Sequence, residues 1–289
     1  MTTLLIIDCQ RDFHPGGSLA IPNADSDALR ISKLIKTHGG SIDRIIATLD
    51  SHHPLHIAHP GFWRHSITND GPSPFTMISS GDIENGTWIP RGDVKSGGGR
   101  YPYPILEGYE NADLHRAFDV GAYCIEYARR LEMGGRFRLC IWPEHCLIGS
   151  SGHGIVDVVF DAMNAWCRDT GGIIEYVYKG MNPWTEMYSA LCAEVPVGID
   201  TGFNRDLLES LKDGTDRLVV CGQALSHCVN YTVRDIVDNW PKDERSKIVI
   251  LKDCASSVPG FEGAGEIFLT DMENAGVRVG TSDALFRAE

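Results

Sequence analysis

The chain is 289 residues long, 43 % of them apolar, and its formal net charge is −13. This length allows one large domain or one domain with an insertion, and the composition excludes a disordered chain. The acidic balance disfavours nucleic acid as a partner. No apolar run approaches the roughly 20 residues that cross a membrane, so we expect no membrane partner.

Nine cysteines are scattered along the sequence without a Cys-x-x-Cys pair. An odd number in this pattern argues against a disulfide framework and against a zinc knuckle. The chain begins directly with an apolar segment instead of the basic start of a secretory signal. We therefore expect a reducing, cytoplasmic setting.

Apolar strand patterns alternate with amphipathic helix patterns along the chain. In order, the pattern predicts a strand at 3–8, a helix at 24–37, a strand at 44–50, a helix at 117–133, a strand at 138–141, a helix at 157–168, strands at 172–178 and 218–221, a helix from 226, a strand at 246–251, a helix at 262–274 and a strand near 277–279. Such alternation implies a parallel sheet with right-handed crossovers. We expect an α/β, Rossmann-like fold: a three-layer open sheet of about six parallel strands with helices on both faces.

A long irregular stretch interrupts this alternation. Residues from about 62 to 115 are rich in Gly, Pro, Ser and Tyr, and the stretch is too long for an ordinary connection. We expect a single domain over residues 1–289 with an insertion at 62–137 that acts as a lid or an oligomer contact. Its Ser-Gly-Gly-Gly run at 96–99 lacks the lysine and the glycine spacing of a phosphate-binding loop.

The segment from Leu218 to Thr232 contains a candidate reactive cysteine, Cys228. Its apolar start predicts a strand buried on both faces, Gly222 ends that strand, and Ser226 is a candidate N-cap for the helix that follows. Cys228 then lies in the first helical turn, beyond the carboxyl end of a strand, where open α/β sheets bind ligands. A thiol there loses its proton more easily than a free one, although a buried structural cysteine is the plain alternative.

Two charged residues follow other predicted strands. Asp8 ends the first strand, and Lys179 follows the strand at 172–178. A cation lowers the pKa of a nearby thiol, and a carboxylate can take the thiol proton and pass it to a leaving group. The alternatives are a turn former for Asp8 and a solvated charge for Lys179. We hypothesise that both meet Cys228 in one site.

Five motifs stand out in order along the chain. They are Leu5-Ile-Ile-Asp-Cys-Gln-Arg-Asp-Phe-His-Pro-Gly-Gly-Ser-Leu19, Thr48-Leu-Asp-Ser-His52 with His56, Trp142-Pro-Glu-His-Cys146, Tyr178-Lys-Gly180 and Gly222-Gln-Ala-Leu-Ser-His-Cys-Val229. Together they resemble the nicotinamidase-like branch of the isochorismatase-like cysteine hydrolases. The resemblance covers residues 1–60 and 140–260, and residues 62–137 have no recognised counterpart.

The resemblance implies roles for the residues already singled out. Asp8 would be the acid and base, Lys179 the activating cation and Cys228 the nucleophile. It also implies a non-proline cis peptide bond between Gln223 and Ala224. The backbone N–H groups of Ala224 and Cys228 would then form the oxyanion hole.

Asp50, His52 and His145 form a candidate metal site. One carboxylate and two imidazoles suit Zn²⁺ best and would also accept Fe²⁺ or Mn²⁺. In the enzymes that the motifs resemble, the corresponding residues hold a divalent ion that binds the pyridine nitrogen of nicotinamide. His56 lies where some of those enzymes add a further ligand.

Three other histidines, His53, His59 and His65, crowd the same loop. By default we expect them to be solvated or to support the ligands without binding the ion. The alternative for the whole loop is a surface histidine cluster with fortuitous affinity for metals.

Three residues are candidates for the substrate pocket: Phe13, Trp63 and Tyr188. The resemblance implies that Phe13 walls the pocket for the substrate ring, whereas a core position is the alternative. Trp63, like Trp88, either lines this pocket or belongs to the insertion. Tyr188 lies in Glu186-Met-Tyr-Ser, where the family usually has Asp-Ser-Tyr-Ser, and this departure leaves the local hydrogen bonding open.

The activity that the resemblance implies is metal-assisted amide hydrolysis through a cysteine thioester. The enzyme would release ammonia from a small aromatic or heteroaromatic amide such as nicotinamide. The alternatives are a metal-free carbamoyl or ureido amidohydrolase of the same family and a non-catalytic metal-binding protein on this fold. The expected partners are a small-molecule amide and further copies of the chain in a homo-oligomer.

Overall fold

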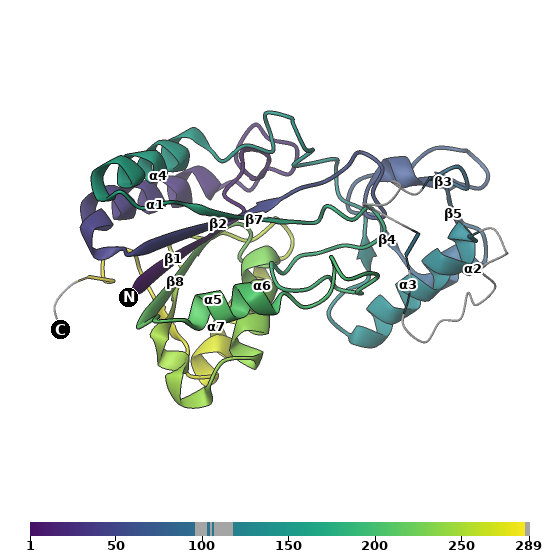
Figure 1. Ribbon diagram of the computed structural model, residues 1–289. Helices are drawn as coiled ribbons and strands as arrows, with labels where there is room; N and C mark the ends of the chain where they lie inside the picture. The colour runs from purple at the N-terminus through teal and green to yellow at the C-terminus, as the bar shows by residue number, and fades with distance from the viewer. Residues whose placement is uncertain (96–102, 105, 107–117, 287–289) are drawn as a thin grey trace.

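A parallel six-stranded sheet forms the centre of the protein (Figure 1), with strand order β10-β9-β8-β1-β2-β7. The computed structural model describes residues 1–95, 103, 104, 106 and 118–286, and the run at 96–99 lies outside these ranges. The strands are β1 (Thr2–Ile7), β2 (Arg44–Asp50), β7 (Glu175–Lys179), β8 (Arg217–Gly222), β9 (Ile248–Leu251) and β10 (Arg278–Gly280). Every neighbouring pair runs parallel, as predicted.

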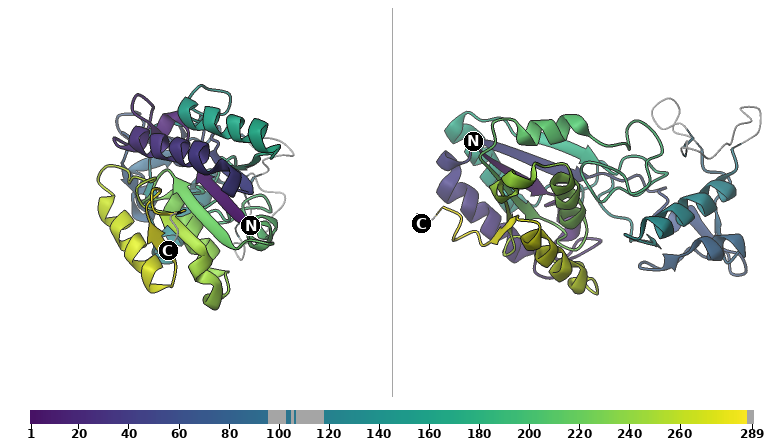
Figure 2. Two further views of the ribbon diagram at one scale, coloured as in Figure 1. Left: turned by 90° about the vertical axis from the view of Figure 1, so that its left-hand side faces the viewer. Right: turned by 90° about the horizontal axis from the view of Figure 1, so that it is seen from below.

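Helices cover both faces of this sheet, which confirms the predicted three-layer α/β fold. One face carries α1 (Ala24–His38) and α4 (Asp157–Thr170), and the other carries α5 (Arg205–Lys212), α6 (Cys228–Asp238) and α7 (Glu262–Asn274). The left view of Figure 2 shows the two helical layers on opposite sides of the strands. Buried apolar side chains form two core clusters, and alternate β1 residues enter each of them: Leu5 and Ile7 the first, Leu4 and Ile6 the second.

A smaller lobe lies at the end of the sheet away from the N-terminus, where β1 and its parallel neighbours finish (Figures 1 and 2). Its elements are β3 (Trp63–His65), β4 (Met77–Ile78), α2 (Ser80–Glu84), β5 (Trp88–Pro90) and α3 (Val120–Gly134). The strand predicted at 138–141 is the short β6 (Leu139–Cys140), which pairs antiparallel with β4 and not with the central sheet. The prediction was wrong on its partner because a short apolar run does not specify which strand it joins.

Two local features of the second half differ from the prediction. Helix α5 was not expected, although it buries Leu207, Leu208 and Leu211 on one side. Ser226 is not the N-cap of α6: His227 holds that position, and the Ser226 hydroxyl accepts a hydrogen bond from the Val258 N–H at 3.1 Å. The helix therefore begins at Cys228 itself.

Gly222 ends β8 next to the end of β1, as the sequence predicts. It adopts φ +114°, and a Cβ atom there would lie 1.9 Å from the carbonyl oxygen of Ile7. Glycine is the residue that permits this backbone conformation and this close approach. The loop from β8 to α6 therefore passes directly beside Asp8.

Short 3-10 turns complete the described elements: Arg11–Phe13, Gly39–Ser41, Pro60–Phe62 and Lys242–Lys247. All nine cysteines are free. Within the described part of the chain, no helix combines the length and the apolar character that crossing a membrane requires.

Candidate functional site

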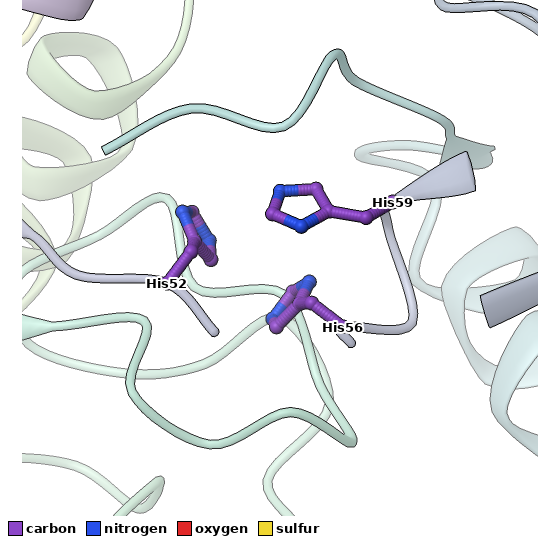
Figure 3. Close-up of side chains that lie close together, drawn as sticks. All are labelled: His52, His56 and His59. Atoms are coloured by element: carbon purple, nitrogen blue, oxygen red, sulfur yellow. The ribbon is translucent and has the colours of Figure 1, made fainter. Parts of the chain in front are cut away.

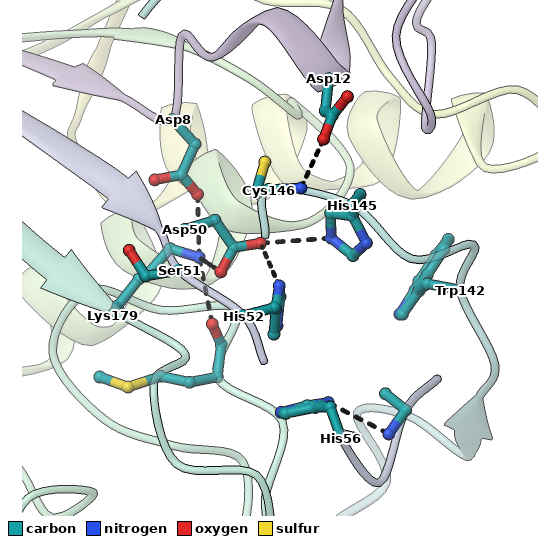
Figure 4. Close-up of polar contacts among 12 residues, drawn as sticks. Asp8, Asp12, Asp50, Ser51, His52, His56, Trp142, His145, Cys146 and Lys179 are labelled. Carbon is teal, nitrogen blue, oxygen red and sulfur yellow. Dashed lines mark hydrogen bonds and ion pairs between the residues drawn. The ribbon is translucent and has the colours of Figure 1, made fainter. Parts of the chain in front are cut away.

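The carboxyl ends of β1, β2 and β7 meet the start of α6 around one buried ammonium group. Lys179 ends β7, is 2 % exposed, and lies next to acidic side chains that follow or end the neighbouring strands. Its Nζ lies 2.9 Å from Asp8 Oδ2, 3.0 Å from Asp50 Oδ1, 3.1 Å from the Met187 carbonyl oxygen and 3.5 Å from Cys228 Sγ. Figure 4 shows Asp8, Asp50 and Lys179 converging on this point. The structure thus brings Asp8, Lys179 and Cys228 together.

The charges in this cluster support one another. Burial opposes the charge of Lys179, but the carboxylates of Asp50 and Asp8 raise its pKa well above the usual value. Burial likewise opposes the charge of Asp50, whereas His52 and Lys179 lower its pKa well below the usual value. These neighbours favour the ammonium form of Lys179 and the carboxylate form of Asp50.

The thiol of Cys228 behaves differently from the prediction. Burial raises its pKa well above the usual value, and Lys179 only partly opposes this effect. Burial also raises the pKa of Asp8, against the attraction of Lys179. For the sulfur, the effect of burial thus exceeds that of the lysine, whereas the sequence predicts easier proton loss at this place. Asp8 is the candidate acceptor of the Cys228 proton.

The loop before Cys228 carries the cis peptide bond between Gln223 and Ala224 that the resemblance implies. Among the described residues, neither the Ala224 N–H nor the Cys228 N–H has a hydrogen-bond acceptor. The Gln223 side chain donates from Nε2 to Asp27 Oδ2 at 2.9 Å, and its backbone N–H donates to the Ile7 carbonyl at 2.7 Å. Two free amide donors are thus held beside the sulfur by a loop that is fixed on both sides.

The predicted metal ligands also lie together. Asp50 Oδ2 is 3.6 Å from His52 Nδ1 and 3.3 Å from His145 Nε2, and all three side chains are buried. His145 Nδ1 lies 2.8 Å from the carbonyl oxygen of Pro143, to which it donates in the neutral tautomer. A histidine that donates from one ring nitrogen to a backbone carbonyl presents the other as a metal ligand.

The rings of His56 and His59 lie beside the His52 ring (Figure 3), with centroids 4.6 and 5.0 Å from it, and their ring nitrogens differ in availability. His59 Nδ1 lies 3.4 Å from the Pro54 carbonyl, and its Nε2 is buried without a partner. His56 has both nitrogens in use, because Nε2 faces the Thr185 carbonyl at 3.1 Å and Nδ1 accepts from the Ala58 N–H at 3.2 Å. Of the two alternatives expected for His59, the solvated one is wrong, since the side chain is fully buried, and a position that supports the ligands stays open.

Glu186 completes this cluster, and sequence reasoning gave it no role. Its Oε1 lies 3.6 Å from His52 Nε2, and its Oε2 is buried without a partner. Burial opposes its charge, but His52 and His56 lower the pKa of Glu186 to about 2. The departure from the Asp-Ser-Tyr-Ser pattern at this position was the signal in the sequence.

The donor set fits a divalent cation. Both ring nitrogens of His52, Nε2 of His59 and Oε2 of Glu186 are buried polar atoms without hydrogen-bond partners. Ligand atoms of Asp50, His52 and His145 lie within 4.8 Å of one another, as do those of His52, His56 and His59. Buried unpaired polar groups are costly, and mixed imidazole and carboxylate donors suit zinc and similar ions.

A narrow pocket joins this cluster to the thiol. Its lining residues are Phe13, Leu19, Asp50, Trp142, His145, Glu186, Tyr188, Ala224, His227, Cys228 and Val258. Phe13 and Tyr188 thus lie where the sequence predicted them. Trp63 does not, because it is fully buried in the core and its Nε1 donates to the Ile57 carbonyl at 2.7 Å. Trp142 provides a pocket wall instead, and Trp88 packs on His65 in the smaller lobe.

Two residues of the first motif fix the site from outside. Gln10 clamps the backbone of Asp50, donating to its carbonyl at 2.7 Å and accepting from its N–H at 2.7 Å. Asp12 Oδ2 accepts from the Cys146 N–H at 2.6 Å and so holds the loop that carries His145. Polar side chains that bond to backbone in this way leave no periodic signal in a sequence.

No protein-family model matches the chain. A curated nicotinamidase from Acinetobacter baylyi is 29 % identical over 117 residues, which cover 40 % of this chain and 44 % of that protein. The match therefore spans less than half the length of this curated relative.

Solved structures match over almost the whole chain. A nicotinamidase/pyrazinamidase of Acinetobacter baumanii superposes with a TM-score of 0.62 at 20 % identity, covering 99 % of this chain and 98 % of that one. The yeast nicotinamidase bound to the inhibitor nicotinaldehyde gives 0.63 at 19 % identity, covering 97 % and 100 %. A pyrazinamidase of Pyrococcus horikoshii in complex with zinc gives 0.54 at 19 % identity, covering 97 % and 98 %.

This chain has the nicotinamidase fold. The resemblance predicted from the five motifs is confirmed, and so is the fold class. The nicotinamidase fold places the thiol, the ammonium, the acids and the histidines of this chain at one end of its sheet.

Proposed function

We propose that this chain is a metal-assisted cysteine amidohydrolase that releases ammonia from a small heteroaromatic amide of the nicotinamide class. One observation carries the proposal: Lys179 Nζ contacts both Asp8 and Cys228, and Cys228 lines the same pocket as Asp50 and His145. The similarity to proteins named nicotinamidase and pyrazinamidase supports the same substrate class.

The thiol and the carboxyl group share one proton during the reaction. Asp8 accepts the proton of Cys228 as the sulfur attacks the amide carbonyl carbon, and the N–H groups of Ala224 and Cys228 stabilise the oxyanion that forms. Asp8 then gives that proton to the departing nitrogen, so ammonia leaves and a thioester remains. Asp8 next takes a proton from water, whose oxygen attacks the thioester, and the acid and the free thiol are released.

Lys179 stabilises negative charge and does not transfer a proton. It holds the carboxylates of Asp8 and Asp50 side by side and lies 3.5 Å from the sulfur, so it favours the thiolate as that charge forms. Its own pKa is raised well above the usual value by these neighbours, against the effect of burial. It therefore remains an ammonium through the cycle.

We infer that Asp50, His52 and His145 hold a divalent ion, with Zn²⁺ as the first expectation and Fe²⁺ or Mn²⁺ as alternatives. His59 is better prepared than His56 to add a fourth ligand, because its Nε2 has no hydrogen-bond partner. When bound, the ion supplies a Lewis-acidic anchor for a ring nitrogen of the substrate. Glu186 adds negative charge that favours a cation at this place.

We further propose that the segment at 62–137 closes over the pocket. Phe75 contacts the pocket-lining Trp142 edge to face at 5.7 Å, and the Ile141 N–H donates to the Thr76 carbonyl at 2.9 Å. These contacts support a lid role for the smaller lobe. A homo-oligomeric assembly and a cytoplasmic location stay predictions of the sequence.

The test is ammonia release from nicotinamide, pyrazinamide and a carbamoyl amide, with and without a chelator. We expect turnover of the heteroaromatic amides, lost on chelation. Cys228→Ala should abolish turnover and retain the bound metal, because the sulfur lies outside the ligand set. Wild-type rates in Cys228→Ala would refute the thioester. Turnover of the carbamoyl amide by a protein that binds no metal would favour the metal-free alternative.

A further inference from the structure

The pocket contains an imidazole that the proposed reaction does not use. His227 immediately precedes Cys228, lines the same pocket and is 4 % exposed. Its ring packs against aromatic side chains, with centroids 5.1 Å from Trp142, 5.2 Å from Tyr188 and 4.8 Å from Phe261. An imidazole thus forms part of a pocket wall that is otherwise aromatic and aliphatic.

The hydrogen bonds around Ser226 fix the tautomer of this imidazole. Ser226 Oγ accepts from the Val258 N–H at 3.1 Å and lies 2.8 Å from His227 Nδ1. Among the described residues the Ser226 hydroxyl proton has no other acceptor, so it is donated to Nδ1. Burial lowers the pKa of His227 to about 4, and the neutral ring therefore carries its own proton on Nε2.

The Nε2–H of His227 has no acceptor among the described residues, while its polar neighbours on the wall satisfy each other. Trp142 Nε1 donates to the Tyr188 hydroxyl at 3.0 Å. Because His227 lines the pocket, a bound ligand covers this donor, and the donor then costs free energy unless the ligand brings an acceptor. A pocket of this kind distinguishes ligands by whether they carry the acceptor.

We propose that His227 Nε2–H is a specificity-determining donor that selects amides whose ring carries a hydrogen-bond acceptor beside the carbon that bears the carboxamide. The expected position rests on the pocket, because His227 and Cys228 line it together and the sulfur of Cys228 would meet the carboxamide carbon. Ser226 is its positioning residue. The inference rests on the proposed function and deepens it by assigning a second point of recognition, separate from the one at Asp50, His52 and His145.

A matched pair of amides tests this donor. Pyrazinamide differs from nicotinamide by one ring nitrogen, which replaces the C–H next to the carboxamide-bearing carbon. We expect the wild-type protein to favour pyrazinamide in kcat/KM by about tenfold, mainly through KM, the size of one buried hydrogen bond. His227→Phe keeps a ring and removes the donor, so it should abolish the preference. His227→Gln places an amide N–H near the same point and should restore part of it.

Phe13→Leu is the control, because it alters the same pocket without touching a donor. It should lower kcat/KM for both amides by the same factor. A preference that is equal in the wild type and in His227→Phe overturns the proposal. So does a loss in His227→Phe that is the same for both amides and confined to kcat.

Two measurements separate this inference from the proposed hydrolysis. Calorimetric titration of Cys228→Ala with each amide measures binding without turnover, and equal affinities for the two amides overturn the donor. Tighter binding of pyrazinamide by a protein whose wild type releases no ammonia would support the donor and refute the hydrolysis. Nitrogen NMR of the His227 ring gives the tautomer directly, and a proton on Nδ1 would overturn the inference.

Discussion

Lys179 is the single residue on which the charge balance of the site depends. It is a buried ammonium between the buried carboxylates of Asp8 and Asp50, and each ion pair measures 3.0 Å or less. Such a group contributes little net stability compared with an apolar core, but the removal of one partner leaves the others unpaired. Its contribution is therefore best measured by replacing Lys179 and comparing the loss of stability with the loss from replacing an exposed lysine.

Lys179→Met should abolish turnover and destabilise the protein by about 3–5 kcal/mol, because two buried carboxylates lose their cation. Lys33→Met is the matched control: Lys33 pairs with Asp283 at 3.0 Å with both side chains well exposed. This control should change the unfolding free energy by about 0.5 kcal/mol or less. Urea denaturation and ammonia release measure the two effects. Equal stability changes in the two variants would contradict the buried ion-pair network.

We expect His59 and His56 to differ in how much they contribute to metal affinity. His59→Ala removes an unpartnered Nε2 and should weaken zinc binding by about tenfold or more. His56→Ala removes a ring whose two nitrogens already bond to backbone, and it should weaken zinc binding less. Competition with a chromophoric chelator gives both affinities without any turnover. A larger loss in His56→Ala would assign the additional ligand to His56 instead.

The sequence could not choose between these two histidines. Their spacing from Asp50 predicts only that both lie near the end of β2. Which ring nitrogen is free depends on the carbonyls of Pro54 and Thr185, one local and one more than a hundred residues distant. That Asp50, His52 and His145 lie together was predictable, because motif order and strand ends indicate it. Glu186 became recognisable only through its 3.6 Å approach to His52.

At the level of elements, α1 supports the loop between β8 and α6. Asp27 on α1 is 1 % exposed and accepts from Gln223 Nε2 at 2.9 Å, next to Ala224. Burial raises the pKa of Asp27, against hydrogen bonds from Ser256 and Gln223. Hydrogen bonds from the loop thus stabilise the buried carboxyl group of Asp27, and the carboxyl group in turn fixes the position of the loop.

Asp27→Ala should lower kcat by about tenfold and change KM little, because a misplaced Ala224 amide affects the oxyanion more than the bound amide. Asp25→Ala on the same helix is the control: this side chain is 61 % exposed and contacts His14 at the surface. It should leave both constants near the wild-type values. A change in KM without a change in kcat would place the effect of Asp27 on substrate binding.

The helices and strands that the sequence predicted are those with a clear apolar periodicity. The strands of the central sheet and helices α1, α4 and α7 lie close to their expected bounds, and β1, β2, β8 and β9 bury nearly continuous apolar runs. Helix α5 was missed because its apolar stripe is only three leucines long and lies in a charged segment. Strand β6 was found, but its partner β4 belongs to the insertion, where composition gives little periodicity.

At the scale of the whole molecule, one buried acid links stability to pH. Burial raises the pKa of Glu194 to about 8, and Arg136 only partly opposes this. Its Oε1 has no hydrogen-bond partner among the described residues. The folded protein therefore binds a proton here that the unfolded chain releases at a lower pH. A raised carboxyl pKa makes the folded state less stable as pH rises from about 5 to about 8.

Glu194→Gln should flatten this decline, because the amide stays neutral while it keeps the shape of the acid. The unfolding free energy, measured by urea at several pH values between 5 and 8, gives the slope. Glu209→Gln on exposed helix α5 is the control and should leave the slope unchanged. An identical slope in the wild type and in Glu194→Gln would show that this carboxyl group does not titrate in that window.

The contact between Gly222 and Ile7 has a consequence for how the chain could evolve or be redesigned. Residue 7 directly precedes Asp8, and residue 222 begins the loop that leads to Cys228, with less than two ångströms between a hypothetical methyl group at 222 and the opposing oxygen. Any side chain there would wedge two adjacent strands apart and carry acid and sulfur away from each other. The absence of a Cβ atom at position 222 therefore keeps the carboxyl group of Asp8 and the sulfur of Cys228 close together.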